Sequence, residues 1–251
     1  MPDHRAFCRP ADPEAVQLTL DAEESHHLIS VNRVREGETV TLFDGRGAEW
    51  VCTLDAADRR AARLHVRLRS KAKPLNYRVS LGQALPKGPA MDAIVRKATE
   101  LGATRIIPLE SERTQVHLED DRGDRKVEKW RTASIEAAKQ CGNPWLPEIE
   151  PVQTAVKYME QVRGYDLKLI ASLQPGARSL KAVLADFRAE RGGGPKEALW
   201  LVGPEGDFTP AELSAAQSAG FVPVTLGPLV LRCETAAIYA LGVLSYELQN
   251  P

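Results

Sequence analysis

Two segments near the end of the chain share one pattern: an apolar run, a turn containing glycine, and then the start of a helix-like segment. The first is residues 201–208, LVGPEGDF, and the second is residues 226–236, LGPLVLRCETA. Open α/β sheets bind their ligands at the carboxyl ends of strands, where turns of this kind lie. Neither turn matches the G-x-G-x-x-G or G-x-x-x-x-G-K-[ST] loops of common nucleotide sites. The pattern therefore predicts an α/β domain with a ligand site of another kind.

The first part of the chain has a different periodicity. Up to about residues 70–78, short segments alternate apolar and polar residues, at 16–20, 39–43, 49–54 and 63–69. Residues 44–47, DGRG, have the composition of a hairpin turn, and residues 23–33 form one short helix-like interruption. This part predicts a small β-barrel or sandwich.

The second part alternates strand-like and helix-like segments. Apolar runs at 105–109, 167–171, 198–202 and 222–226 predict strands, and helices are expected near 90–101, 125–141, 180–190, 210–219 and 234–248. Thr209 and Glu212 form a capping box before the fourth of these helices, with Pro210 at its first position. Such alternation is typical of a mostly parallel sheet with helices on both faces. We place the domain boundary between residues 73 and 74.

Composition excludes several classes of protein. The 251 residues include 33 Lys and Arg against 34 Asp and Glu, so only a local basic patch could attract nucleic acid. The four cysteines have no C-x-x-C spacing, and neither H-E-x-x-H nor G-x-S-x-G occurs, which argues against a metal centre and a serine hydrolase. No apolar run reaches 18 residues and no signal-peptide pattern opens the chain, so we expect a cytoplasmic protein without a membrane partner.

A basic strand in the first part favours an RNA partner. Alternation places Leu64, Val66 and Leu68 on the core face of residues 63–71, and the basic side chains on the other face. A solvated strand face normally mixes charges of both signs, whereas a stripe of one sign in a neutral protein is typical of phosphate binding. The basic residues of the stripe are Arg63, His65, Arg67, Arg69 and Lys71.

Several residues of the second part have both a functional and a structural interpretation. One glycine turn could be an ordinary strand-to-helix connection, but two on successive strands favour a binding site. Arg232 lies immediately before a helix and should project toward the turns, which favours a functional role. Glu234 and Thr235 are also ordinary helix-start residues. Lys87 and Arg113 each follow the end of a strand-like segment and are candidate substrate contacts.

These segments together resemble the RsmE family of SPOUT-class ribosomal RNA methyltransferases. The resemblance rests on QALPKG at 83–88, KATELG at 97–102, SER at 111–113, EAAKQCG at 136–142, GPEG at 203–206 and LRCETA at 231–236. Near the start, Arg5 with Phe7 and residues 27–33 are similar to the family's PUA-like RNA-binding domain.

The resemblance implies a fold and an activity. Residues 1–73 would be a PUA-like β-barrel and residues 74–251 a SPOUT α/β domain whose last segment is threaded as a trefoil knot, an exception to unthreaded connections. The family binds S-adenosyl-L-methionine in that knot, acts as a homodimer, and methylates N3 of a uridine in the 16S rRNA of the small ribosomal subunit.

The resemblance also implies roles for single residues. Arg232 would be catalytic, because an arginine near O2 or O4 of the base stabilises the anion left when the N3 proton departs. Cofactor contacts would be Leu173, Leu201, Gly203, Glu205, Gly206, Leu226, Gly227, Leu231, Cys233, Thr235 and Ala236. RNA contacts would be Arg5, Arg33, Arg63, Arg67, Arg69, Lys87 and Arg113. The group that takes the proton stays open between Glu205 and Glu234.

Four positions depart from the family pattern. Asp207, Leu229, Cys233 and Asn143 stand where the family usually has Gly, Arg, Thr and often Arg. Two alternatives to the methyltransferase also stay open: a non-catalytic RNA-binding protein that uses the basic strand, and a small-molecule α/β enzyme that uses only the turns.

Overall fold

The computed structural model describes residues 4–114 and 120–249. The chain divides into two compact units, one of residues 1–74 with 135–146 and one of residues 75–134 with 147–251. Helix α3 (Asp120–Cys141) contributes residues to both units. None of the described helices is long and apolar enough to cross a membrane.

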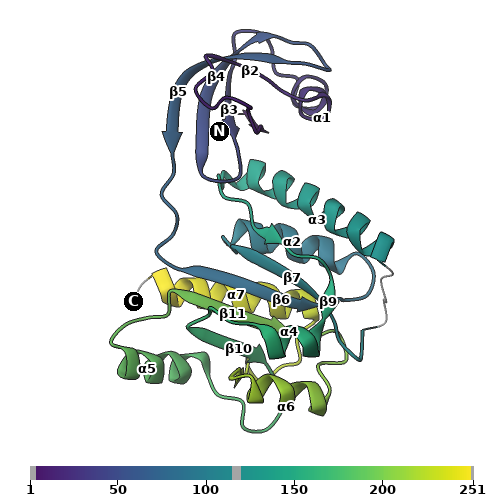
Figure 1. Ribbon diagram of the computed structural model, residues 1–251, viewed down its shortest axis with the longest axis vertical. Helices are drawn as coiled ribbons and strands as arrows, with labels where there is room; N and C mark the ends of the chain where they lie inside the picture. Colours follow the sequence, from purple (N-terminus) through teal and green to yellow (C-terminus); the bar gives the residue numbers. More distant parts are fainter. Residues whose placement is uncertain (1–3, 115–119, 250–251) are drawn as a thin grey trace. The chain divides into compact units, whose positions relative to one another are not determined.

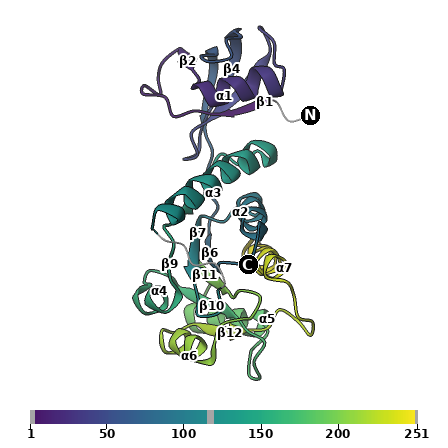
Figure 2. The same cartoon turned by 90° about the vertical axis from the view of Figure 1, so that its right-hand side faces the viewer.

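The first unit is built on a five-stranded sheet in the order β1-β3-β4-β5-β2 (Figures 1 and 2). Its strands are β1 (His4–Phe7), β2 (Gln17–Thr19), β3 (Thr39–Phe43), β4 (Ala48–Ala56) and β5 (Arg63–Lys71). Strand β1 pairs in parallel with β3, and the other pairings are antiparallel. Helix α1 (Ala22–His26) continues into a π-helical turn, His27–Val31, whose Leu28 and Ile29 pack in the core of this sheet. The predicted hairpin at residues 44–47 and the predicted short helix are confirmed; strand β1 is not among the predicted elements.

The predicted alternation of β5 is wrong from Leu68 onward. Leu64 and Val66 lie in the core as expected, but Leu68 is 61% exposed. The cause is a β-bulge: Cys52 pairs with Val66 and Val51 with Leu68, so one extra residue stands between them on β5. Side chains beyond the bulge therefore face the opposite way from the two-residue alternation.

Residues 135–146 are anchored in the first unit by charge and by shape. The ammonium group of Lys139 lies 2.5 Å from the carboxylate of Glu24 and 2.8 Å from that of Glu136, and Lys139 is buried. Burial lowers the pKa of Lys139, but the hydrogen bonds to Glu136 and Glu24 more than reverse this and raise it. A Cβ on Gly47 would overlap the ring of Trp145, so glycine is needed there for the two segments to approach.

The second unit is built on a parallel sheet in the order β12-β10-β11-β6-β7-β8, with the short β9 also paired to β7 (Figure 1). Its strands are β6 (Arg78–Ala84), β7 (Arg105–Glu110), β8 (Glu148–Ile149), β9 (Gln153–Thr154), β10 (Leu167–Ala171), β11 (Glu197–Val202) and β12 (Val222–Val224). Each of the described pairings in this sheet is parallel. The predicted α/β class and the parallel sheet are confirmed. Strand β6 was expected only as a strand-like segment before Lys87, and β8 and β9 were not among the predicted strands.

Helices cover both faces of this sheet. Helices α2 (Ala90–Glu100), α5 (Leu180–Arg191), α7 (Cys233–Gln249) and residues 127–133 of α3 pack on one face, around Trp200. Helices α4 (Ala155–Gln161) and α6 (Pro210–Ser218) pack on the other face, around Phe208. The capping box is confirmed: Thr209 Oγ1 accepts from the Glu212 amide, and the Glu212 carboxylate accepts from the Thr209 amide. Helix α4 is absent from the predicted elements.

Candidate functional site: a pocket at the carboxyl ends of three strands

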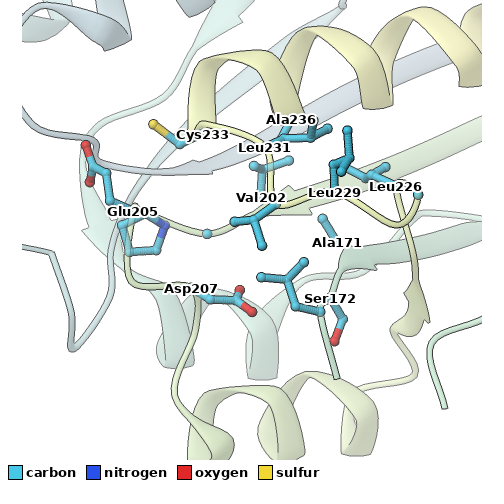
Figure 3. A pocket seen from close by; sticks show the side chains of 15 residues that line it. Ala171, Ser172, Val202, Glu205, Asp207, Leu226, Leu229, Leu231, Cys233 and Ala236 are labelled. Carbon is cyan, nitrogen blue, oxygen red and sulfur yellow. The ribbon is translucent and has the colours of Figure 1, made fainter. Parts of the chain in front are cut away.

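The carboxyl ends of β10, β11 and β12 meet at one pocket with an empty volume of about 550 Å³, partly open to solvent (Figure 3). The lining residues come from the ends of these strands, from the loop after β12 and from the first turn of α7. They are Ala171, Ser172, Leu173, Val202, Gly203, Pro204, Glu205, Asp207, Leu226, Gly227, Leu229, Val230, Leu231, Cys233 and Ala236.

The turn after β11 closes tightly over Gly203. The Asp207 amide donates to the Pro204 carbonyl oxygen at 2.9 Å, which completes a β-turn. A Cβ on Gly203 would lie 2.9 Å from Asp207 Oδ1 and 3.1 Å from both the Asp207 Cα and the Phe208 amide nitrogen. Two of those atoms belong to the backbone, so making room for a Cβ would require the turn itself to shift. Glycine at 203 is therefore a condition for the turn, and Gly203 is one of the residues that line the pocket.

Asp207 occupies a backbone conformation that favours glycine. Its φ is 58°, and Arg33 is the other non-glycine residue with positive φ in the described part of the chain. Asp tolerates this region better than most residues, because its short polar side chain can bond locally. Asp207 Oδ1 accepts a hydrogen bond of 2.8 Å from the Phe208 amide. Burial raises the pKa of Asp207, while the Phe208 and Leu173 amides and the charge of Arg113 oppose the increase without cancelling it.

The outer side of the same turn is held by two other loops. The Lys87 amide donates to Glu205 Oε1 at 2.9 Å, and the Arg113 guanidinium donates to the Gly206 carbonyl oxygen. A second, more open pocket of about 880 Å³ lies here, lined by Lys87, Glu112, Arg113, Thr114, Glu205 and Gly206. The two pockets share Glu205. Sequence reasoning predicted Lys87 and Arg113 as substrate contacts, and the structure brings both to this second pocket.

The loop after β12 forms the opposite wall of the first pocket. Gly227 has a φ of 117°, and Thr225 Oγ1 accepts from its amide at 3.2 Å. Leu231 and Cys233 line the pocket, while Arg232 between them is exposed and is not among the lining residues. The Arg232 carbonyl oxygen accepts from the Ala236 amide at 2.8 Å, which places Arg232 at the start of α7, beside the mouth of the pocket.

The thiol of Cys233 is buried in this wall. Burial first, and then a hydrogen bond from the thiol to Glu234, raise its pKa to about 12. The thiol is therefore neutral at physiological pH, and it contributes a small apolar surface to the pocket.

Eight of the eleven predicted cofactor contacts line the pocket. They are Leu173, Gly203, Glu205, Leu226, Gly227, Leu231, Cys233 and Ala236. Gly206 lines the second pocket instead, and Thr235 is exposed on the first turn of α7, outside the lining. Leu201 is fully buried on the other face of the sheet, with Ile107 and Phe208, and its neighbour Val202 faces the pocket.

The predicted RNA contacts of the first unit have different surroundings. Arg33, Arg63 and Arg67 are exposed, and Arg67 also donates to Thr53 Oγ1. Arg5 is paired with Glu49 at 2.7 Å and lies over the Phe43 ring, with only 12% of its side chain exposed. Arg69 lies beyond the bulge and donates to the carbonyl oxygens of residues 13–15. Arg5 is therefore largely closed to solvent, whereas the side chain of Arg69 is still 35% exposed but is bonded to the loop of residues 13–15. The other three arginines are exposed.

Several lining residues were not predicted: Ala171, Ser172, Val202, Pro204 and Val230, together with Asp207 and Leu229, which were noted only as departures from the family pattern. Ala171 and Ser172 could have been predicted from a parallel order with β10 beside β11, because the carboxyl ends of adjacent parallel strands lie at one edge of the sheet. Within the described residues, no three His, Cys, Asp or Glu side chains come together as a metal site.

The chain is similar to two protein-family models and to several known proteins. The model of an RNA methyltransferase domain matches residues 73–245, and that of an RNA methyltransferase PUA domain matches residues 20–66. The ribosomal RNA small subunit methyltransferase E of Bacillus subtilis is 30% identical over 94% of this chain and 92% of its own length. The protein of the same name from Synechocystis is 32% identical over 98% of this chain and 78% of its own length.

Solved structures of methyltransferases are also similar to this chain. A putative methyltransferase of Legionella pneumophila, solved with bound SAM, has a TM-score of 0.88 and 29% identity over 98% of both chains. A ribosomal RNA small subunit methyltransferase E of Neisseria gonorrhoeae, bound to S-adenosyl methionine, has a TM-score of 0.86 and 27% identity over 98% of both chains. The chain therefore belongs to the RNA methyltransferase family that contains the ribosomal RNA small subunit methyltransferases E.

Proposed function

We propose that this protein transfers a methyl group from S-adenosyl-L-methionine to N3 of a uridine in the 16S rRNA of the small ribosomal subunit. The observation that carries the proposal is the pocket itself: glycine turns from β11 and β12 frame an apolar cavity in a chain that matches the methyltransferase family over residues 73–245.

The lining suits this cofactor. Val202, Leu226 and Leu231 provide apolar walls for an adenine ring, and the tight turn over Gly203 brings backbone groups to the cavity. When bound, the cofactor supplies an electrophilic methyl group on a sulfonium sulfur. The predicted contacts that line the pocket would hold it, with Gly206 and Thr235 acting through the turn and through the first turn of α7.

The second pocket suits a nucleotide. Lys87 and Arg113 line this pocket together with Glu205, so cationic groups stand next to the wall of the cofactor pocket. The N3 edge of uridine takes part in Watson–Crick pairing, so the base has to be unpaired or flipped out before it reacts. Arg232, exposed beside the pocket mouth, is our candidate for stabilising the anion that forms when the N3 proton leaves.

The first unit offers a surface for the RNA backbone. Arg33, Arg63 and Arg67 are exposed there, and phosphate contacts of this kind give affinity that falls with salt concentration. Arg5 and Arg69 support this surface through Glu49 and through the loop of residues 13–15. We therefore assign residues 1–73 to RNA binding and residues 74–251 to methyl transfer.

We further propose that the protein acts as a homodimer in the cytoplasm. Tyr239 and Tyr246 of α7 are 48% and 67% exposed, and Leu229 and Val230 of the loop before it are 73% and 79% exposed. Exposed apolar groups of this kind mark an interaction surface. Sedimentation of the purified protein at several concentrations tests the dimer, and fractionation of cells tests the location.

The activity is tested by mass spectrometry of rRNA from a deletion strain. We expect loss of one N3-methyluridine, restored by the wild-type gene and not by Arg232→Ala. The matched control is Arg178→Ala, which removes an exposed arginine that pairs with Asp186 outside the pocket. Labelled S-adenosyl-L-methionine with purified small subunits tests the reaction directly. Intact N3-methyluridine in the deletion strain would contradict the proposal, and RNA binding without any cofactor binding would favour a non-catalytic protein.

A further inference from the structure

The ionisable side chains that line the cofactor pocket are Glu205, Asp207 and Cys233; no Lys, Arg or His is among its lining residues. The Cys233 thiol is neutral, so the charge of the lining comes from two carboxylates. These two groups have different surroundings. Glu205 is exposed, and its Oε1 is taken by the Lys87 amide. Asp207 is half-buried, and Figure 3 shows its carboxylate turned toward the interior of the pocket, while that of Glu205 lies at the edge.

The backbone conformation of Asp207 is strained. A non-glycine residue with φ of 58° is strained relative to glycine by about 1 kcal/mol, and such strain persists where the surroundings fix it. The Phe208 amide fixes Oδ1, and Asp207 Oδ1 lies beside Gly203, where a Cβ would come within 2.9 Å of it. The carboxylate therefore has a defined position against the backbone that faces the ligand.

The cation that favours the ionised form of Asp207 lies outside the pocket. Burial raises the pKa of Asp207, and the Phe208 and Leu173 amides and then the charge of Arg113 oppose that rise. Arg113 holds the Gly206 carbonyl oxygen and lines the second pocket and not the first. A ligand in the first pocket therefore meets the negative carboxylate without an intervening cation from the lining.

We propose that Asp207 makes the pocket select for a ligand with a positive charge at its reacting centre, and so favours the sulfonium donor over the neutral thioether that remains after transfer. This inference rests on the proposed function. Transfer forms the bond between the methyl carbon and N3 of the uridine, which has given up its proton, and breaks the bond between the methyl carbon and the sulfur. The electrons of the broken bond stay on the sulfur, so the ligand loses one positive charge. Asp207 then no longer attracts it at the sulfur, which assists release of the product.

The test is calorimetric binding of three ligands to the full-length protein: S-adenosyl-L-methionine, S-adenosyl-L-homocysteine, and sinefungin, which carries an amine in place of the methylated sulfur. Asp207→Asn removes the charge and leaves one acceptor oxygen for the two amides, of Phe208 and Leu173, that bond the carboxylate; the loss of the second acceptor should affect all three ligands alike. We expect it to weaken binding of the two cationic ligands by about tenfold and to change that of the neutral product by less than about twofold. Asp207→Gly, which also relieves the strain, should lose the same preference. Asp186→Asn, a carboxylate-to-amide change outside the pocket, should keep it.

Equal weakening of all three ligands would overturn the inference, because it would show that Asp207 shapes the turn or pairs with the α-ammonium group that all three ligands carry. An unchanged ratio of affinities in both Asp207 variants would overturn it as well, while leaving the proposed function intact. If wild-type protein bound none of the three ligands, the cofactor pocket itself would be refuted.

Discussion

The carboxylate of Glu205 and the backbone amide of Lys87 form a hydrogen bond of 2.9 Å between residues 118 positions apart in the chain. It joins the loop after β6 to the turn after β11, and these two strands are neighbours in the sheet. Glu205 also belongs to both pockets. The bond thus couples the wall of the cofactor pocket to the loop that carries Lys87, a candidate RNA contact.

Glu205→Ala should lower kcat/KM for methyl transfer by about tenfold, because a lost hydrogen bond of this kind costs about 1–1.5 kcal/mol. Glu205→Gln retains an oxygen that accepts from the Lys87 amide, and we expect it to stay within about threefold of wild type. Steady-state kinetics with labelled cofactor and small subunits measures both variants. Equal losses in the two variants would show that the charge of Glu205 matters and not the link between the loops.

Gly82 of β6 lies where the sheet has no room for a side chain. A Cβ there would overlap the side chain of Leu201 and would lie 3.3 Å from Leu109 Cδ1. Gly82→Ala should therefore destabilise the second unit by about 1–3 kcal/mol through overpacking. Gly193→Ala, in a loop where nothing lies within 4 Å of the added Cβ, is the matched control and should be neutral. Urea unfolding compares them, and equal stability of the two variants would contradict this view of the packing.

The face of a fully buried strand cannot be derived from its sequence, and β11 illustrates this. Residues 198–202 are all apolar and all buried, since helices cover both faces of the sheet. Nothing in that run distinguishes Leu201 from Val202. Leu201 was predicted to contact the cofactor, but it faces away from the pocket, and Val202 lines it. The turns beside the strand were located correctly because glycine, proline and a capping box identify them in sequence.

The first unit shows where a periodic pattern stops being informative. The side-chain orientation predicted from alternation in β5 is correct for Leu64 and Val66 and wrong for Leu68. The bulge adds one residue between Val66 and Leu68, and the local sequence does not indicate it. Partners distant in sequence were equally inaccessible. The contact of Lys139 with Glu24 spans 115 residues, and alternation or helical periodicity carries no information about such a pair. The threading implied by the family was likewise beyond any periodic pattern.

Lys139→Met should destabilise the first unit by about 3–5 kcal/mol. The substitution leaves the carboxylate of Glu24, which has a side chain only 10% exposed, without its cation, and an unpaired buried charge is costly. Lys97→Met is the matched control: its pair with Glu100 is exposed, and such pairs contribute about 0–1 kcal/mol. Adding Glu24→Gln to Lys139→Met should restore part of the lost stability. Urea unfolding of the four proteins tests this, and a double variant no more stable than Lys139→Met would refute the pairing.

The four thiols should divide into one that reacts and three that do not. Cys141 is exposed, whereas burial raises the pKa of Cys8 to about 11 and those of Cys52 and Cys233 to about 12. Because the thiolate is the reactive form, a disulfide reagent at pH 8 should modify one thiol rapidly in native wild-type protein and none in Cys141→Ser.

The raised pKa values of the three buried thiols also predict a loss of stability at alkaline pH. In the unfolded chain the three thiols regain pKa values near 9, so their contribution is complete below pH 9 and declines as the pH rises toward 11 and 12. Urea unfolding at pH 8 and at pH 10.5 should show this loss, and Cys52→Ala should reduce it. Rapid modification of more than one thiol at pH 8, or a loss unaffected by Cys52→Ala, would contradict the buried, protonated state of these groups.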